Sequence, residues 1–267
     1  MSSNTGGEQA VVTERRGAAL WIIINREERR NALNPHVTGG IEAGLREAAA
    51  TPGVRAVVIT GKGEKAFCAG ADLTRGTGVF TEGLNEPTTD FGRLARVAHG
   101  FGLPLIARIN GACVAGGMGI MALCDMAIAA DHARFGLPEG KVGVFPMQVM
   151  VYLRHHIAPR HANALCLTGE LINAAKAYEI GLVNEVVPLA GLDAAVDRMV
   201  GQIAAMSPVA IRRGKYAIAH MQDMAFHEAL TFAETQIAVT SNTADATEGL
   251  AAFNEKRPPS WVAGGQS

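Results

Sequence analysis

The segment that decides the fold reads Asn110-Gly111-Ala112-Cys113-Val114-Ala115-Gly116-Gly117-Met118-Gly119. A strand is predicted to end before it, Asn110-Gly111 is typical of a turn, and a helix of small residues is predicted to open at the glycine pair. The first N–H groups of a helix have no partner inside the helix, and glycine lets an oxygen approach them closely. The helix dipole adds a partial positive charge, so the N-terminus of such a helix can bind an anion or a developing oxyanion. Close helix packing would use the same glycines, so the segment alone leaves both interpretations open.

A second segment of small residues precedes this one. It reads Lys65-Ala66-Phe67-Cys68-Ala69-Gly70-Ala71-Asp72-Leu73 and follows a predicted buried strand at residues 54–60. Its N–H groups could supply the other half of a site for an oxyanion. Taken alone, the segment is explained better by an ordinary loop between a strand and a helix.

A third segment places a carboxylate among apolar residues. It reads Phe135-Gly136-Leu137-Pro138-Glu139, and the apolar residues Val142, Val144 and Phe145 follow. Poor solvation of the charged form raises the pKa of such a carboxyl group. A raised pKa suits a residue that must both take and give a proton, although a solvated loop glutamate is the alternative.

The predicted elements indicate two parts of the chain. Strands at 10–15, 18–25, 54–60, 104–109, 126–130 and 183–187 alternate with helices at 35–50, 90–101 and 117–124. The last third is nearly all helix, at 149–157, 160–167, 173–180, 192–205, 209–221, 226–240 and 243–254. This pattern predicts an α/β core over residues 1–205 and a helical C-terminal subdomain over residues 206–267. Residues 62–72 are predicted to form a loop, and the Gly- and Thr-rich residues 74–87 a mobile surface segment.

In this order, the three segments resemble the crotonase family, also called enoyl-CoA hydratase/isomerases. The resemblance covers about residues 10 to 257 and includes Arg30-Asn31-Ala32-Leu33-Asn34, Leu167-Thr168-Gly169 and Phe253-Asn254-Glu255-Lys256-Arg257. It implies a crotonase-like spiral of strand-strand-helix turns with a C-terminal helical subdomain. It also implies an enzyme that acts on acyl-CoA thioesters and assembles as a homotrimer, or as a dimer of trimers, through that subdomain.

The resemblance also implies roles for individual positions. A thioester carbonyl oxygen would lie between the N–H groups of Ala71 and Gly116, which stabilise an enolate, while Glu139 moves protons. Coenzyme A would be bound in a bent shape along residues 26–32, where a guanidinium can pair with a phosphate, although a solvated loop arginine is the alternative. The residues expected to contact substrate or coenzyme A are Arg26, Arg30, Ala32, Ala69, Asp72, Leu73, Gly117 and Lys256.

Gly119 departs from the hydratase pattern, because the resemblance implies a second catalytic glutamate at this position. Met118, Ile120 and Met121 cannot replace that glutamate. Hydration needs two groups, whereas one base can shift a double bond by moving a proton between two carbons. We therefore favour double-bond isomerisation by Glu139 alone. A 2-enoyl-CoA hydratase that lacks the second glutamate and an acyl-CoA-binding protein that has lost catalysis are the alternatives.

Composition restricts the remaining possibilities. The 267 residues are 48% hydrophobic and 18% charged with a formal net charge of −1, which is typical of a globular protein without a basic field for nucleic acid or anionic membranes. No uncharged stretch reaches the roughly 20 residues of a membrane span, and the N-terminus does not resemble a secretory signal, so a cytoplasmic location is expected. The four cysteines are expected to be reduced core thiols, and the histidines are not spaced as a metal site. No metal and no cofactor are expected, since coenzyme A is part of the substrate.

Overall fold

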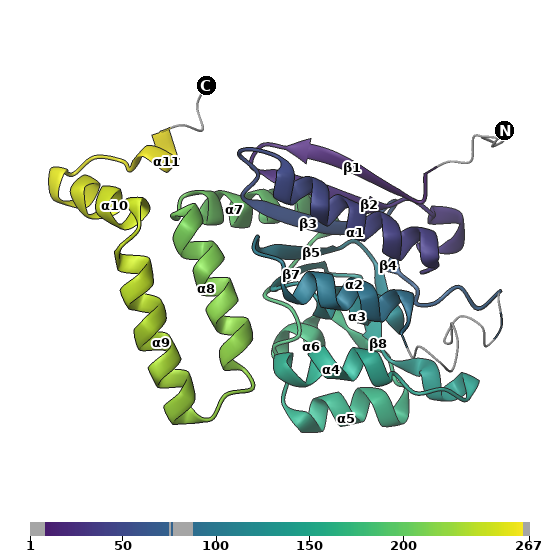
Figure 1. Ribbon diagram of the computed structural model, residues 1–267. Coiled ribbons are helices and arrows are strands. Elements are labelled where there is room, and N and C mark those ends of the chain that lie inside the picture. Colours follow the sequence, from purple (N-terminus) through teal and green to yellow (C-terminus); the bar gives the residue numbers. More distant parts are fainter. Residues whose placement is uncertain (1–8, 75, 77–87, 264–267) are drawn as a thin grey trace, which may run out of the picture.

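The computed structural model describes residues 9–74, 76 and 88–263, and a six-stranded sheet forms its centre (Figure 1). The strand order is β1-β2-β3-β5-β7-β10. Only β1 and β2 pair antiparallel, and the other neighbours are parallel. Every residue of β3 is buried, as expected for a parallel strand covered on both faces. The strands are β1 Val11–Arg16, β2 Ala19–Ile24, β3 Ala56–Gly61, β5 Leu105–Ile109, β7 Met126–Ala130 and β10 Glu185–Val187.

The sheet separates two apolar layers, because successive side chains of a strand point to opposite faces. On one face, Ile22 and Ile24 pack with Ile41 of α1 (Pro35–Ala50), and α2 (Asp90–His99) and α3 (Gly116–Ala122) join this layer. On the other face, Trp21 packs with Val196 of α7 (Leu192–Ala204). The helix predicted at residues 35–50 is therefore confirmed, and its buried face includes Val37, Ile41 and Leu45.

A second, four-stranded sheet has the order β4-β6-β8-β9. Its strands are β4 Ala66–Cys68, β6 Ala112–Val114, β8 Arg134–Gly136 and β9 Ile172–Asn173. The chain enters β4, β6 and β8 directly after β3, β5 and β7, so each turn runs through a strand of each sheet before its helix, and the expected strand-strand-helix spiral is confirmed. The prediction of a continuous loop at residues 62–72 was wrong, because β4 lies within it. Strands of two or three residues are too short to show an alternating pattern.

Three further helices lie in the lower part of the molecule in Figure 1: α4 Met147–His156, α5 Pro159–Thr168 and α6 Ala174–Glu179. The chain also forms the short 3-10 helices η1 Glu27–Arg29, η3 Pro138–Val142 and η4 Leu189–Gly191. Most predicted helix ends lie within two residues of the observed ones. The predicted mobile segment at 74–87 lies almost entirely outside the described residues.

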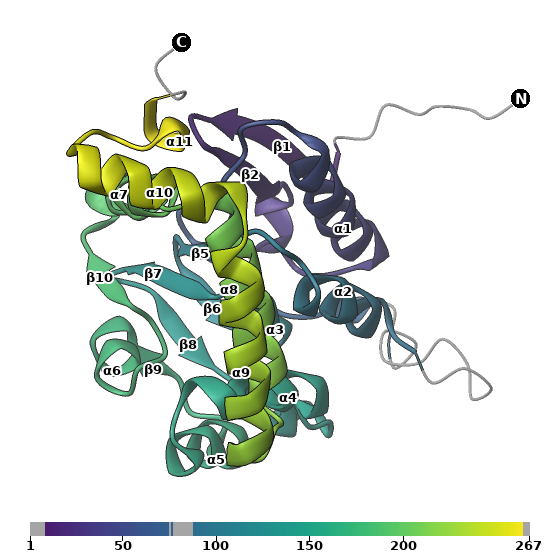
Figure 2. The ribbon, with the colours of Figure 1, turned by 60° about the vertical axis from the view of Figure 1, so that its left-hand side comes forward.

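The C-terminal helices lie beside the core. Figure 1 shows α8 (Pro208–Met221) and α9 (Phe226–Ser241) as an antiparallel pair, with α10 (Ala244–Glu255) and α11 (Ser260–Ala263) at its end, and Figure 2 shows this group in front of the sheet. The proposed boundary after residue 205 falls between α7 and α8 and stays a prediction. In the part of the chain that the structure describes, no helix is long and apolar enough to cross a membrane.

Candidate active site

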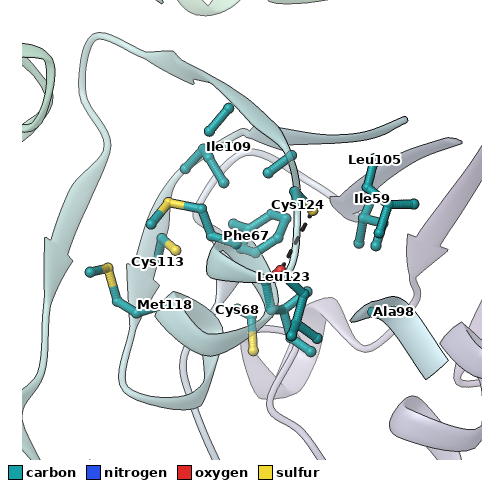
Figure 3. Packing of buried hydrophobic residues seen from close by; sticks show 14 of the residues in the cluster. Ile59, Phe67, Cys68, Ala98, Leu105, Ile109, Cys113, Met118, Leu123 and Cys124 are labelled. Atoms are coloured by element: carbon teal, nitrogen blue, oxygen red, sulfur yellow. Dashed lines mark hydrogen bonds between the residues drawn. The ribbon is translucent and has the colours of Figure 1, made fainter. Parts of the chain in front are cut away.

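A cavity of about 1090 Å³ lies where the three segments singled out from the sequence meet. Its wall includes Ala69, Ala71 and Leu73 after β4, Gly116 at the start of α3, and Glu139 in η3. These positions are up to 70 residues apart in sequence, and the small sheet brings them together because β4, β6 and β8 are neighbours in it. Phe67 and Cys68 of β4 and Cys113 of β6 pack with Met118 of α3 in one buried apolar cluster (Figure 3).

Ala71 and Gly116, the two predicted donors, lie close together on one edge of the cavity. Ala71 forms an isolated parallel bridge with Leu33, but the bridge uses the N–H of Leu33 to the Gly70 oxygen at 2.7 Å and the N–H of Asp72 to the Leu33 oxygen at 2.8 Å. The N–H of Ala71 is not one of these two donors. Gly116 begins α3, so its N–H has no partner inside the helix. An ideal Cβ on Gly116 would lie 3.6 Å from the Ala71 nitrogen, which shows how closely the two positions approach.

Backbone geometry explains the small residues at this edge. Gly70 has a φ of +94°, and an added Cβ would lie 2.7 Å from the Ala115 Cβ. Ala115 itself has φ 50° and ψ −125°, a conformation that costs a residue other than glycine on the order of 1–3 kcal/mol. Ala115 also lines the cavity, although the sequence analysis did not give this position a role.

Glu139 places a carboxylate on the cavity wall, and one of its two oxygens has no hydrogen-bond partner among the described residues. It follows Pro138 at the start of η3, just beyond β8, and lines the cavity. Its Oε2 atom is buried, and no described residue donates a hydrogen bond to it. Burial raises the pKa of Glu139 above its ordinary value of 4.5. Burial, together with the negative charge of Glu139, also raises the pKa of Cys166 to about 11, so this neighbouring thiol stays protonated at neutral pH.

An aromatic ring covers Gly119, where the resemblance implies a hydratase glutamate. An ideal Cβ on Gly119 would lie 2.8 Å from Cζ of Phe91 and 3.2 Å from Cγ2 of Val149. Phe91 and Val149 both line the cavity. The helix at residues 90–99 was predicted, but no local signal in the sequence shows that its first turn lies against α3.

The other carboxylates of the wall are engaged in ion pairs. Asp72 pairs with Arg26 at 2.9 Å, and Asp90 pairs with Arg93. Among the described residues that line the cavity, Glu139 is thus the one carboxylate without an ion pair. The arrangement can therefore hold an oxygen between two N–H groups and move a proton with a single carboxylate.

The predicted contacts of coenzyme A are only partly brought together. Ala69, Asp72 and Leu73 line the cavity with the two proposed donors, and Asn34, Thr38, Lys141 and Gln148 add polar groups that the sequence analysis did not single out. The wall does not include Arg26, Arg30, Ala32, Gly117 or Lys256. Gly117 instead packs its Cα against the Cys68 carbonyl, where an added Cβ would collide. Lys256 is the C-cap of α10, among the C-terminal helices.

Fold and site together define an α/β protein of strand-strand-helix turns, with a cavity that the turns of the small sheet line. The model of the Enoyl-CoA hydratase/isomerase family matches residues 14–264. The chain belongs to this family, and the expected crotonase resemblance is confirmed.

Individual relatives match over nearly the whole chain. The crotonyl-CoA hydratase of Syntrophomonas wolfei is 31% identical, over 94% of this chain and 97% of its own. The (E)-benzylidenesuccinyl-CoA hydratase of Thauera aromatica is also 31% identical, over 90% of this chain and 94% of its own. The crystal structure of an enoyl-CoA hydratase from Bacillus anthracis superposes with a TM-score of 0.88 and 32% identity, over 94% and 98% of the two chains.

Proposed function

We propose that the protein is an enoyl-CoA isomerase that shifts the double bond of an acyl-CoA thioester with Glu139 as its single acid/base. The observation that carries the proposal is the cover of Gly119 by Phe91 and Val149. Position 119 thus supplies no carboxylate and has little room for one, and Glu139 is the one described carboxylate of the cavity wall without an ion pair. A reaction that needs one proton carrier suits this wall better than a reaction that needs two.

The proposed reaction begins with a 3-enoyl-CoA. The Glu139 carboxylate takes a proton from C2, and the electron pair moves into the thioester carbonyl to give a dienolate. The N–H groups of Ala71 and Gly116 donate hydrogen bonds to the negative oxygen, and removal of one such donor typically costs about 3–4 kcal/mol in the barrier. Protonated Glu139 then returns the proton to C4, and a double bond forms between C2 and C3. Coenzyme A is part of the substrate, so this scheme uses no separate cofactor.

The electrostatics of Glu139 support this role. Its pKa is raised because burial disfavours the charged form, and its Oε2 atom has no hydrogen-bond partner among the described residues. A carboxylate that is poorly solvated is a stronger base than a solvated one, and its acid form persists closer to neutral pH. Both properties are needed by a group that takes and returns a proton in one turnover.

Hydration of a 2-enoyl-CoA is the second candidate, because two of the relatives are hydratases by name. Hydration needs one group to activate water and another to protonate C2. Asp72 and Asp90 are the other carboxylates of the described wall, and both are held in ion pairs. A hydratase would therefore need water activated by Glu139 alone, or a rearrangement of Asp90. Loss of catalysis in favour of acyl-CoA binding is disfavoured by the unpartnered Glu139 oxygen.

Assembly and location complete the proposal. We expect a homotrimer, or a dimer of trimers, in the cytoplasm, with the C-terminal subdomain from residue 206 forming the contacts. Phe226 of α9 is 73% exposed and Phe253 of α10 is 81% exposed, and such apolar surface usually meets a partner.

A substrate panel tests the reaction type directly. Purified protein is incubated with 2-enoyl-CoA and 3-enoyl-CoA series of increasing chain length, and hydration and isomerisation are followed separately. The proposal predicts that 3-enoyl-CoA is converted to 2-enoyl-CoA faster than 2-enoyl-CoA is hydrated. Faster hydration across the panel would reject it in favour of the hydratase.

A further inference from the structure

The guanidinium of Arg26 joins the loop that carries Ala71, one of the two proposed oxyanion donors, to the loop that precedes α1. Its Nη2 donates to Asp72 Oδ2 at 2.9 Å, and its Nη1 donates to the Ala32 carbonyl at 2.6 Å. Arg26 lies just after β2, Ala32 lies just before α1, and Asp72 follows β4. The side chains of Arg26 and Asp72 are only 16% and 13% exposed. Two of the three guanidinium nitrogens are thus used inside the protein.

Asp72 is held on its second oxygen as well. Its Oδ1 accepts from the Thr74 hydroxyl at 2.7 Å. Its backbone N–H donates to the Leu33 carbonyl, while the Leu33 N–H donates to the Gly70 carbonyl. Ala71 therefore lies between two anchored residues, and the orientation of its peptide plane follows from theirs. The hydrogen bond from Arg26 is the main reason that the pKa of Asp72 is lowered to about 2, so the ion pair stays intact throughout the neutral range.

We infer that Arg26 is a positioning residue: through Asp72 it fixes the Ala71 N–H against Gly116, and it is not a ligand of the coenzyme A phosphates. The inference rests on the proposed function, because it takes the Ala71 N–H as one of the two donors to the thioester oxygen. Misplacement of a catalytic group by about 1 Å can cost about 10²-fold in rate, so a small rotation of this peptide would be measurable. A phosphate ligand, by contrast, would act on affinity.

The experiment separates these two roles with variants of the full-length protein that change Arg26, Asp72 or both. Arg26→Gln and Asp72→Asn each remove the ion pair, and the double variant removes both partners. The control is Arg198→Gln, which breaks an ion pair of 2.6 Å with Glu185 outside the cavity wall. For each protein, kcat and KM are measured with whichever enoyl-CoA the wild type converts best. The affinities for coenzyme A and for butyryl-CoA are measured by calorimetry.

The inference predicts a loss of kcat of about 10- to 100-fold in each single variant. The kcat of the double variant should be no more than about threefold below that of the less active single variant, because both changes break the same contact. Affinity for coenzyme A should stay within about threefold of the wild-type value. The preference for butyryl-CoA over coenzyme A should shrink, because only butyryl-CoA has the thioester carbonyl oxygen that the Ala71 N–H would bind. Arg26→Lys, which keeps the cation, should restore part of kcat. Arg198→Gln should match the wild type.

The opposite pattern would overturn the inference. A loss of coenzyme A affinity of tenfold or more in Arg26→Gln, with kcat unchanged, would make Arg26 a phosphate ligand. An equal loss of kcat in Arg198→Gln would show a general effect of lost ion pairs. If Arg26→Gln fails to fold, the nearly isosteric Asp72→Asn gives the same comparison. If the wild type converts no enoyl-CoA, the proposed function fails, and the ratio of butyryl-CoA to coenzyme A affinity still tests the positioning.

Discussion

Phe91 occupies the space that a side chain at residue 119 would need, since an ideal Cβ on Gly119 lies 2.8 Å from its Cζ. The ring belongs to the first turn of α2 and Gly119 to α3, so the contact depends on how the two helices pack. The lack of a side chain at residue 119 and the apolar cover by Phe91 therefore occur together. Glycine alone would leave room for water, whereas the ring makes this part of the cavity wall apolar.

Gly119→Glu is expected not to create a hydratase by itself. The new side chain must displace the Phe91 ring, and overpacking of this kind typically costs about 1–3 kcal/mol. We expect a melting temperature lowered by roughly 2–4 °C per kcal/mol and no gain in hydration. The double variant Gly119→Glu/Phe91→Ala should recover stability and raise hydration relative to isomerisation. Calorimetry and the two assays measure this, and a single variant with wild-type stability and new hydratase activity would refute the steric account.

Gly116→Val is expected to abolish turnover while the fold persists. The added Cβ would lie 2.9 Å from Leu33 Cδ1 and 3.6 Å from the Ala71 nitrogen, so the branched side chain fills the space proposed for the thioester oxygen. We expect kcat to fall by at least about 10²-fold, which is the loss that removal of one oxyanion donor typically causes. Gly201→Val is the control, because a Cβ there meets nothing within 4 Å. Wild-type rates in Gly116→Val would place the oxyanion site elsewhere.

The activity should depend on pH through Glu139. Only the ionised carboxylate can take the C2 proton, so kcat/KM should rise with pH through the pKa of Glu139 and then level off. Because burial raises this pKa, the acid limb should lie above 4.5. An acid limb at or below 4.5 would contradict the burial argument.

The same shift affects stability with a defined sign. A folded-state pKa above the unfolded value contributes stability that is present below the unfolded pKa and is lost as pH rises through the folded pKa. Glu139→Gln should therefore gain melting temperature relative to the wild type as pH rises through this range. A constant difference across the whole range would show that the carboxylate is as well solvated in the folded protein as in the unfolded chain.

Assembly is expected to depend on the exposed apolar residues of α9 and α10. Phe226→Asp and Phe253→Asp place a charge on surface that we expect to meet another chain, so each should shift the protein from three or six chains toward smaller species. Light scattering at micromolar concentration measures the mass. Lys141→Asp, on the cavity wall, should leave the mass unchanged. A stable monomer for the unmodified protein would contradict the expectation.

The large sheet and its helices could be predicted from local patterns. The run at residues 20–24 is almost wholly apolar because β2 lies between two covered faces, and the stripe of Val37, Ile41 and Leu45 marks the buried side of α1. Proline and asparagine at the start of α1 also match its observed boundary, where the Asn34 side chain accepts from the Val37 N–H. These signals are local, so one sequence was enough.

Contacts between distant residues could not be predicted in this way. The strands of the small sheet are two or three residues long, and their pairing depends on where the larger sheet ends. Arg26 was expected to contact coenzyme A, and no local pattern indicated its ion pair with Asp72, which lies 46 residues further along the chain. The cover of Gly119 by Phe91 likewise depends on helix packing, which no local pattern encodes.

Glu139→Gln is the measurement that tests the central claim most directly. The amide keeps the shape but cannot accept a proton, and positioned proton transfer typically contributes about 10²–10⁴-fold in rate. With a 3-enoyl-CoA in deuterated buffer, we predict that isomerisation falls by at least that order, that exchange of the C2 and C4 protons with solvent stops, and that coenzyme A ester affinity changes little. Efficient hydration of a 2-enoyl-CoA by the unmodified protein, most of it retained in Glu139→Gln, would contradict the account.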